Sequence, residues 1–328
     1  MSYEEILREK YKGKICLVTG GSGFLGSHLC SYLKKLGAIV LQVGSKRADL
    51  CIEKQVKNVF DYYAPFLGIY VPTKFDYIFH LAAFQGAGEF TLKYPAEQFH
   101  KNCLIHTNVL EAWKKYQPQA RFVAMGSTCQ YPAKDILYEE DYMSGPLHPS
   151  VETYGLTRCV LTQGVKAYKQ QHGLKGTTTV LATLYGPGDS FDLSKSHVVS
   201  SLIRKFVEAH KNHSPEVEIW GDGTQMRELI FVEDQVIGIL LCADSDRDII
   251  NVGSGEFGEI TIRHLAEVIK ELIGFEGKLQ YNSERFVGVL RKRLNIDKAI
   301  AEHQWTHIEP MTSLRDGLQK TIEWYQNQ

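Results

Sequence analysis

The stretch that most constrains this chain is VTGGSGFLGSHL, residues 18–29, in which a buried strand leads into a glycine-rich turn and then a helix. Gly20 permits a tight turn, Gly23 lets the backbone approach a pyrophosphate, and Gly26 allows the helix to pack closely on the strand. The helix N-terminus adds backbone N–H donors and the positive end of the helix dipole. Since a strand and a helix flank the glycines, we interpret the stretch as a dinucleotide-binding turn. The cofactor contacts predicted here are Gly20, Gly23, Phe24, Leu25 and Gly26.

Short apolar strands alternate with amphipathic helices over the first half of the chain. This pattern is typical of an α/β fold with a parallel sheet that helices cover on both faces. We therefore predict a Rossmann-type, doubly wound parallel sheet with a smaller, interleaved C-terminal substrate lobe. The predicted strands are 14–19, 38–43, 75–83, 120–127 and 177–186, and the predicted helices are 25–36, 53–63, 96–116 and 153–172.

Beyond residue 185 the alternation loosens, which indicates a second lobe. The dinucleotide-binding domain is expected to comprise residues 1–184 and about 230–256. The nucleotide-sugar-binding lobe is expected to comprise about 185–229 and 257–328. The helices predicted in this half are 197–211, 233–243, 261–273 and 311–327, and its strands are VEIWG and DIINVG.

The composition argues against several other classes of protein. The 328 residues carry a formal net charge of −1, so the overall balance favours neither nucleic acid nor an anionic membrane as a partner. Apolar runs are far shorter than the ~20 residues that a membrane span needs, and the charged N-terminus has no signal-peptide core. The seven cysteines include no CxxC pair, which favours a reducing, cytoplasmic compartment and argues against disulfides and against a metal site.

The second predicted strand runs into VGSKRADL, residues 43–50, where a Rossmann site binds the adenosine ribose. An acidic residue there binds the 2′-hydroxyl of NAD, whereas a basic residue suits the 2′-phosphate of NADP. Because Ser45, Lys46 and Arg47 stand here, we favour NADP(H); NAD(H) is the alternative, since a Lys-Arg pair also fits a solvated turn. The other predicted cofactor contacts are Asp49 and Leu50, beside the adenine, and Leu81, Ala82 and Ala83 of HLAAFQG, where small residues let the backbone approach the cofactor.

Two stretches carry side chains suited to proton and hydride chemistry. MGSTCQYP, residues 125–132, follows a strand and delivers Ser127 to the edge of the sheet where ligands bind. Tyr154 begins the next helix, and Arg158 lies one turn later on the same face. We expect hydride to pass between a nicotinamide and a sugar carbon while Tyr154 carries the matching proton and Ser127 orients the oxygen. The Arg158 cation would stabilise the phenolate and lower the pKa of the tyrosine.

Several stretches follow one another along almost the whole chain: TGGSGFLG, SKRADL, HLAA, STCQYP, WGDGTQMRELIFVEDQ and INVGSGE. In this order they resemble the extended short-chain dehydrogenase/reductases that act on nucleotide sugars, and within them the GDP-L-fucose synthases. The resemblance implies a GDP-sugar substrate, reduction at C4 of its 4-keto form, and epimerisation at C3 and C5. It also implies a homodimer whose four-helix interface is formed by residues 96–116 and 153–172 of each subunit.

The resemblance assigns roles residue by residue. Tyr154 matches the proton-carrying tyrosine, and Ser127 matches the carbonyl-binding serine. Cys129 matches the base of the epimerisation and His197 its acid partner, since one group must remove a proton and another return it on the opposite face. From the residues alone, Cys129 would be a small buried side chain and His197 a helix N-terminal residue. The positions implied to line the sugar-nucleotide pocket are Lys205, Trp220 and Arg227.

Three positions depart from the family pattern. Arg158 replaces a lysine that binds the nicotinamide ribose and supplies charge near the phenol, and arginine is able to do both. Tyr154 and Arg158 are therefore predicted cofactor contacts as well. Thr183 replaces an asparagine that contacts substrate, and Val287 replaces an aspartate in SERFVGVLRKR, residues 283–293. The last two changes imply a variant sugar, such as a heptose or another 4-keto hexose. The substrate contacts predicted in these stretches are Thr183, Arg285 and Arg291.

The sequence therefore predicts a nicotinamide-dependent oxidoreductase that acts at C4 of a GDP-linked sugar, with 3,5-epimerase activity at the same site. One alternative is a GDP-sugar 4-dehydrogenase or epimerase that retains its NAD(H). The other is a non-catalytic dinucleotide-binding protein, which only Arg158 favours. We favour the enzyme because none of the four predicted reacting side chains is missing.

Overall fold

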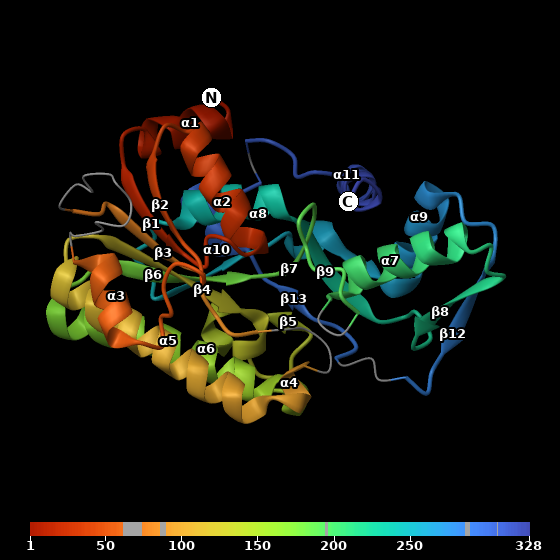
Figure 1. The fold of residues 1–328 in the computed structure, drawn as a ribbon, viewed down its shortest axis with the longest axis horizontal. Helices are drawn as coiled ribbons and strands as arrows, with labels where there is room; N and C mark the ends of the chain where they lie inside the picture. Colours follow the sequence, from red (N-terminus) through yellow and green to blue (C-terminus); the bar gives the residue numbers. More distant parts are fainter. Residues whose placement is uncertain (62–73, 86–89, 194–195, 286–288, 307) are drawn as a thin grey trace.

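The computed structural model describes residues 1–61, 74–85, 90–193, 196–285, 289–306 and 308–328, so Val287 lies outside the described residues. Its main feature is a six-stranded sheet in which every strand pair is parallel (Figure 1). The predicted Rossmann-type α/β fold is confirmed. In order across the sheet, the strands are β2 (Ile39–Val43), β1 (Ile15–Thr19), β3 (Tyr77–His80), β4 (Arg121–Ser127), β6 (Gly176–Leu181) and β10 (Ile249–Val252).

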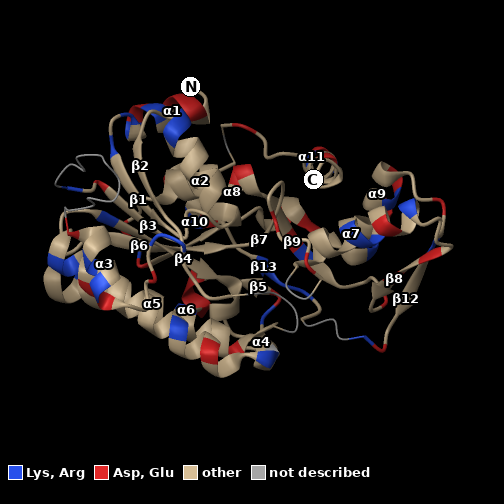
Figure 2. Ribbon diagram, in the orientation of Figure 1, with Lys and Arg blue, Asp and Glu red and all other residues tan. Residues whose placement is uncertain are grey.

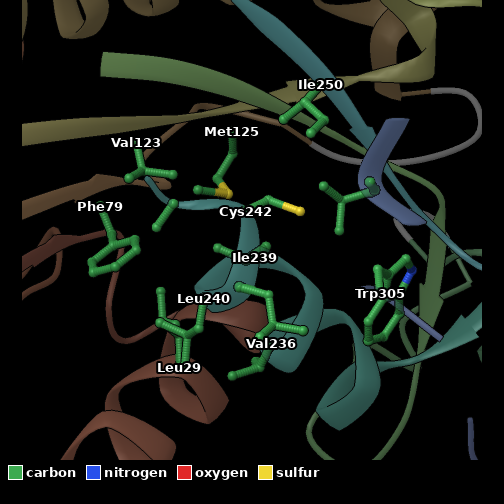
Figure 3. Packing of buried hydrophobic residues seen from close by; sticks show 14 of the residues in the cluster. Leu29, Phe79, Val123, Met125, Val236, Ile239, Leu240, Cys242, Ile250 and Trp305 are labelled. Carbon is green, nitrogen blue, oxygen red and sulfur yellow. The ribbon is translucent and has the colours of Figure 1, made fainter. Parts of the chain in front are cut away.

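Helices cover both faces of this sheet, because successive strand residues are apolar on alternate faces. Val18, Phe79 and Val123 pack with Leu29 and Leu240 in one buried cluster, part of which is drawn in Figure 3. The neighbouring strand residues Leu17, Ile78 and Phe122 point the other way, into a second cluster. The first face carries α1 (Tyr3–Tyr11), α2 (Phe24–Lys35) and α8 (Val232–Cys242), and the second carries α3 (Glu53–Phe60), α5 (Pro95–Tyr116) and α6 (Glu152–His172).

The strand order reverses at β1, which pairs with β2 on one side and with β3 on the other. A crevice therefore opens beyond the carboxyl ends of β1 and β3, and this is where open α/β sheets bind ligands. The first glycine of the turn after β1 stands at this point.

A second lobe is built from the later part of the chain (Figure 1). Its buried cluster includes Val199, Phe206, Leu265 and Leu318, which come from three helices. The lobe comprises α7 (Val198–Lys211), α9 (Ile262–Ile273), α11 (Leu314–Gln326), the parallel pair β8 (Glu216–Trp220) and β12 (Lys278–Asn282), and the sheet β11 (Glu259–Thr261), β9 (Met226–Phe231) and β7 (Thr183–Tyr185). The exact domain bounds stay a prediction.

The single strand expected over 177–186 is wrong, because the structure has two strands in different sheets. β6 ends at Leu181, opposite Val252, where its neighbour β10 also ends. Beyond that point the main sheet offers no partner on this side, and β7 pairs instead with β9 of the second lobe. The turn at Ala182 thus carries the chain from one lobe to the other.

The N-terminal helix α1 was not among the predicted elements. Ser2 and Glu5 form a capping box, in which the Ser2 hydroxyl accepts from the Glu5 N–H and the Glu5 carboxylate accepts from the Ser2 N–H. Figure 2 shows basic and acidic residues interspersed on outer helices such as α1 and α9, in keeping with a formal net charge of −1. Within the described ranges, no helix combines the length and the apolar character needed to cross a membrane.

Candidate active site

The glycine turn after β1 brings backbone from three segments into contact. Gly20 has a φ of 70°, and a Cβ atom there would lie 2.7 Å from the amide nitrogen of Ala82, which follows β3. A Cβ atom on Gly26 would lie 2.2 Å from the carbonyl oxygen of Gly20, so helix α2 packs directly on the turn. Only glycine fits either position, and the backbone of the turn stays open to a ligand.

A cleft of about 980 Å³ extends from this turn along the carboxyl edge of the sheet to the second lobe. All predicted cofactor contacts except Lys46 and Arg47 line it, as do all the predicted reacting groups and Thr183. The predicted residues that line the cleft are Gly20, Gly23, Phe24, Leu25, Gly26, Ser45, Asp49, Leu50, Leu81, Ala82, Ala83, Ser127, Cys129, Tyr154, Arg158, Thr183 and His197.

Tyr154 and Arg158 form one hydrogen-bonded unit on the first turns of α6. Arg158 Nε and Nη2 donate to the Tyr154 hydroxyl oxygen over 2.9 and 2.7 Å, and Nη1 donates to the carbonyl of Met125 in β4 over 3.0 Å. The guanidinium is only 4% exposed, and its carbon lies 5.0 Å from the centre of the tyrosine ring. Burial raises the pKa of Tyr154, and the neighbouring Arg158 cation opposes that rise.

The loop after β4 packs against the start of α6, which joins the two predicted halves of the site. Ser127 ends β4, and its hydroxyl accepts from the Cys129 N–H over 3.2 Å. A Cβ atom on Gly155 would lie 2.1 Å from the carbonyl oxygen of Cys129, so Gly155 is required for this approach. The close contact sets Tyr154 beside Ser127 and Cys129 at the wall of the cleft.

His197 reaches the same cleft from the second lobe. It is the N-cap residue of α7, and its Nδ1 lies 4.0 Å from Oδ1 of Asp189. Asp189 is buried and is held by the Ser190 N–H over 2.7 Å and by the Ser200 hydroxyl. The imidazole of His197 therefore lies next to a buried carboxylate, in the wall of the cleft.

The adenosine end of the cleft fits the predicted cofactor. Arg47 turns back toward the sheet, where its Nη1 donates to the Gln42 carbonyl over 2.8 Å. Its Nη2 is buried and has no hydrogen-bond partner within the described residues. Burial lowers the pKa of this guanidinium. Arg47 itself does not line the cleft, but Ser45 and Asp49 of the same loop do, so a phosphate at this end would offer Nη2 the acceptor that it lacks.

Three predicted substrate contacts form a separate group in the second lobe and do not line the cleft. The Trp220 ring lies between two cations, with Lys205 Nζ at 5.1 Å and the Arg285 guanidinium carbon at 5.5 Å from its centre. Glu218 holds the group together, accepting from Trp220 Nε1 over 3.1 Å and from Arg285 Nε over 3.3 Å. Burial lowers the pKa of Lys205, and Glu218 opposes that change. The arrangement presents an aromatic face flanked by positive charge.

The remaining predicted substrate contacts are tied to the protein itself. Arg291 makes a two-point ion pair with Glu259, at 2.7 and 2.8 Å. Arg227 Nη1 donates to the Met226 carbonyl over 2.7 Å. Lys292 follows Arg291, and burial lowers its pKa, while a charge interaction with Cys129 opposes that change.

Gln85 and Asp189 are among the cleft side chains that sequence reasoning missed, and they are the two that contact predicted reacting groups. Gln85 accepts a hydrogen bond from the Tyr154 hydroxyl, and Asp189 faces His197. The position of Asp189 in YGPGDS, after a strand end, was the available signal; Gln85 had none beyond its place next to HLAA. Over the described part of the chain, no three histidine, cysteine or carboxylate side chains are grouped to hold a metal.

Comparisons with known proteins agree with the family that the sequence motifs predict. Residues 16–253 match the NAD dependent epimerase/dehydratase family. The chain is 34% identical over 318 residues to "Probable GDP-L-fucose synthase 1" of Oryza sativa subsp. japonica, covering 96% of this chain and 92% of that protein. It is 28% identical over 323 residues to GDP-L-fucose synthase of Escherichia coli (strain K12), covering 94% and 95%. A GDP-6-OMe-4-keto-L-xylo-heptose reductase from C. jejuni shares the fold, with a TM-score of 0.83 at 24% identity over 96% of this chain and 98% of that one.

Proposed function

Because the chain belongs to the NAD-dependent epimerase/dehydratase family, we propose that it is a nicotinamide-dependent oxidoreductase acting at C4 of a GDP-linked sugar. The direction we propose is reduction of a GDP-4-keto sugar, with epimerisation at C3 and C5 in the same cleft. Relatives named GDP-L-fucose synthase, aligned over more than nine-tenths of the chain, support this choice.

The observation that carries the proposal is the Tyr154–Arg158 unit in the wall of the glycine-turn cleft. A bound nicotinamide would supply the hydride. Tyr154 then gives its proton to the sugar oxygen, while Ser127 donates a hydrogen bond to the same oxygen and orients it. Arg158 stabilises the phenolate that remains, through two N–H donors and a full positive charge.

Epimerisation requires a base and an acid on opposite faces of the sugar ring. Cys129 from the β4 loop and His197 from α7 line the same cleft but belong to different lobes, which supports these two roles. Lys292 lies close enough to Cys129 for their charges to interact, which supports a role for Cys129 in proton transfer. Nδ1 of His197 faces the buried Asp189 carboxylate at 4.0 Å, which supports its role as the partner of Cys129.

A direct assay tests the proposal. The protein is expected to consume NADPH with GDP-4-keto-6-deoxy-D-mannose, or with a GDP-4-keto-heptose if the sugar is a variant one. In deuterated water the product should carry deuterium at C3 and C5, and Cys129→Ala should lower that uptake by about two orders of magnitude. Cys103→Ala, at a half-buried cysteine of α5 outside the cleft, is the matched control. Unchanged uptake in Cys129→Ala removes the base role, and no consumption of NADPH or NADH with either sugar favours the binding-protein alternative.

NADP(H) is the proposed cofactor, and we expect Arg47 to determine the preference for NADPH over NADH. The buried, unpartnered Nη2 of Arg47 would bind the 2′-phosphate, so Arg47→Ala should weaken NADPH binding about ten- to a hundredfold. NADH binding, measured by the same fluorescence titration, should hardly change. Lys46→Ala, at an exposed neighbour, is expected to have the smaller effect. Equal losses for both cofactors would contradict the phosphate role and favour NAD(H).

We also propose a homodimer formed through α5 and α6. The two helices lie side by side on one face of the sheet (Figure 1) and present exposed apolar side chains, Phe99 and Leu156 among them. Pairing these helices with their copies would bury that surface and brace the start of α6, where Tyr154 lies. A cytoplasmic location is proposed as well, supported by seven cysteines that are all unpaired.

A further inference from the structure

The Tyr154 hydroxyl has more partners than a simple proton donor requires. It accepts two hydrogen bonds from Arg158, at 2.9 and 2.7 Å, and it donates its own proton to the side-chain oxygen of Gln85. Gln85 lines the cleft on the stretch that follows β3, whereas Arg158 is anchored on β4 through the Met125 carbonyl. The proton that the reaction would use is therefore held by an amide.

Gln85 is held in place by the residue before it. The Phe84 N–H donates to the Asn102 side-chain oxygen over 2.8 Å, and Asn102 Nδ2 donates to the Phe84 carbonyl over 3.0 Å. Asn102 is fully buried on α5, and the Lys101 ammonium lies 4.2 Å from the centre of the Phe84 ring. These contacts fix the backbone next to Gln85, while the Gln85 side chain itself is exposed.

The two partners of Tyr154 favour opposite protonation states. Arg158 has only donors, so it stabilises the phenolate more than the phenol. The Gln85 oxygen is an acceptor, so it stabilises the phenol and has nothing to offer a phenolate. The side-chain amide can also rotate, so that its NH₂ group would donate to the phenolate once the proton has moved to the substrate.

We propose that Gln85 is a positioning residue that sets the proton affinity of Tyr154, holding the phenol protonated against Arg158 until the substrate oxygen replaces the amide. The inference rests on the proposed reductase function. In the step it serves, the O–H bond of Tyr154 breaks as the O–H bond of the product alcohol forms. The phenolate left behind keeps its two bonds from Arg158 and regains a proton from water.

Among the described residues, few other charged or titratable groups lie around Tyr154. Cys129, from the loop after β4, raises the pKa of Tyr154, in the same direction as burial. His197 and Asp189 line the cleft from the second lobe, and Asp49 and Lys101 line its cofactor end. Behind Arg158, His80 and His106 are buried together, with ring nitrogens 2.9 Å apart. Burial lowers the pKa of His80 to about 3, so the imidazoles stay neutral at ordinary pH.

Two substitutions of opposite sign test the role of Gln85. Gln85→Met keeps the length of the side chain and removes the acceptor, so the pKa of Tyr154 should fall by about half a unit to one unit. Gln85→Glu keeps the shape and adds a negative charge, so the pKa should rise by at least as much. The readout is the ultraviolet absorbance of the phenolate in the cofactor-free protein. Because the chain has 17 tyrosines, each titration is repeated in a protein that also carries Tyr154→Phe. The difference between the two curves is the signal of Tyr154.

Turnover gives an independent reading of the same shift. Reduction needs a protonated Tyr154, so the rate falls as pH rises through its pKa; that limb should move to lower pH in Gln85→Met and to higher pH in Gln85→Glu. The proposal is overturned if the alkaline limb and the titrated pKa of Tyr154 are unchanged in both variants. It is also overturned if they shift in the same direction in both. A purely structural role predicts lower turnover and lower thermal stability with no opposite shifts. The absorbance titration needs no substrate, so it judges Gln85 even if the proposed reaction is wrong.

Discussion

Tyr154→Phe is expected to lower turnover of the 4-keto sugar about a thousandfold while leaving the fold and cofactor binding intact. The substitution removes the only group that we assign as proton donor to the sugar oxygen. The ring remains, and with it the packing of the Arg158 guanidinium 5.0 Å from the ring centre. Arg158 Nε and Nη2 lose their acceptor, but Tyr154 and Arg158 both line the cleft, so water can replace the hydroxyl.

The matched control is Tyr138→Phe, at an exposed tyrosine that does not line the cleft. Rapid-mixing measurements of NADPH oxidation should separate the two variants, since only Tyr154→Phe slows the proton-coupled step. Dissociation of NADPH and thermal unfolding should be the same in both. If Tyr154→Phe retained turnover within about tenfold of the wild type, another group would have to supply the proton, and the proposal for this residue would fail.

The main sheet and the glycine turn were predictable because their signals are local. A strand, a turn and a helix need only neighbouring residues to form, and the crevice beyond β1 follows from the parallel arrangement of the strands. The joining of Tyr154 to Ser127 depended on one residue of no chemical interest, Gly155. Its missing side chain lets α6 approach the carbonyl oxygen of Cys129.

The second lobe was less predictable because its contacts are between distant parts of the chain. Nothing in the local sequence ends β6 at Leu181; the partner strand β10, some seventy residues later, ends opposite it. Asp189 and Gln85 were also not predictable from a local motif. Their importance comes from their partners, which are His197 for Asp189 and Tyr154 for Gln85. Family resemblance identified Lys205, Trp220 and Arg285, but it did not predict that these residues form a group separate from the cleft.

The second large effect is expected at Arg158. Arg158→Met should reduce turnover about a hundredfold, because the phenolate loses both N–H donors and the nearby positive charge. Since Arg158 opposes the rise in the pKa of Tyr154, its removal should raise that pKa further. The rate of reduction falls above the pKa of Tyr154, so the alkaline limb should move to higher pH. Stopped-flow pH profiles of NADPH oxidation, with NADPH saturating, measure both effects.

Arg158→Lys separates charge from geometry. A lysine four residues after Tyr154 keeps the positive charge, and its ammonium can donate to the hydroxyl, but it cannot give two donors to that oxygen and a third to the Met125 carbonyl. We therefore expect turnover within about tenfold of the wild type, with an alkaline limb between those of the wild type and Arg158→Met. If Arg158→Lys behaved like Arg158→Met, the fixed planar fork would be the essential property; if Arg158→Met kept full turnover, the guanidinium would have no part in the proton step. The intermediate result would mean that arginine differs from lysine chiefly because it cannot lose its proton at any working pH. The positive charge beside Tyr154 is then constant, and Gln85 is the neighbour that adjusts the proton affinity of the phenol.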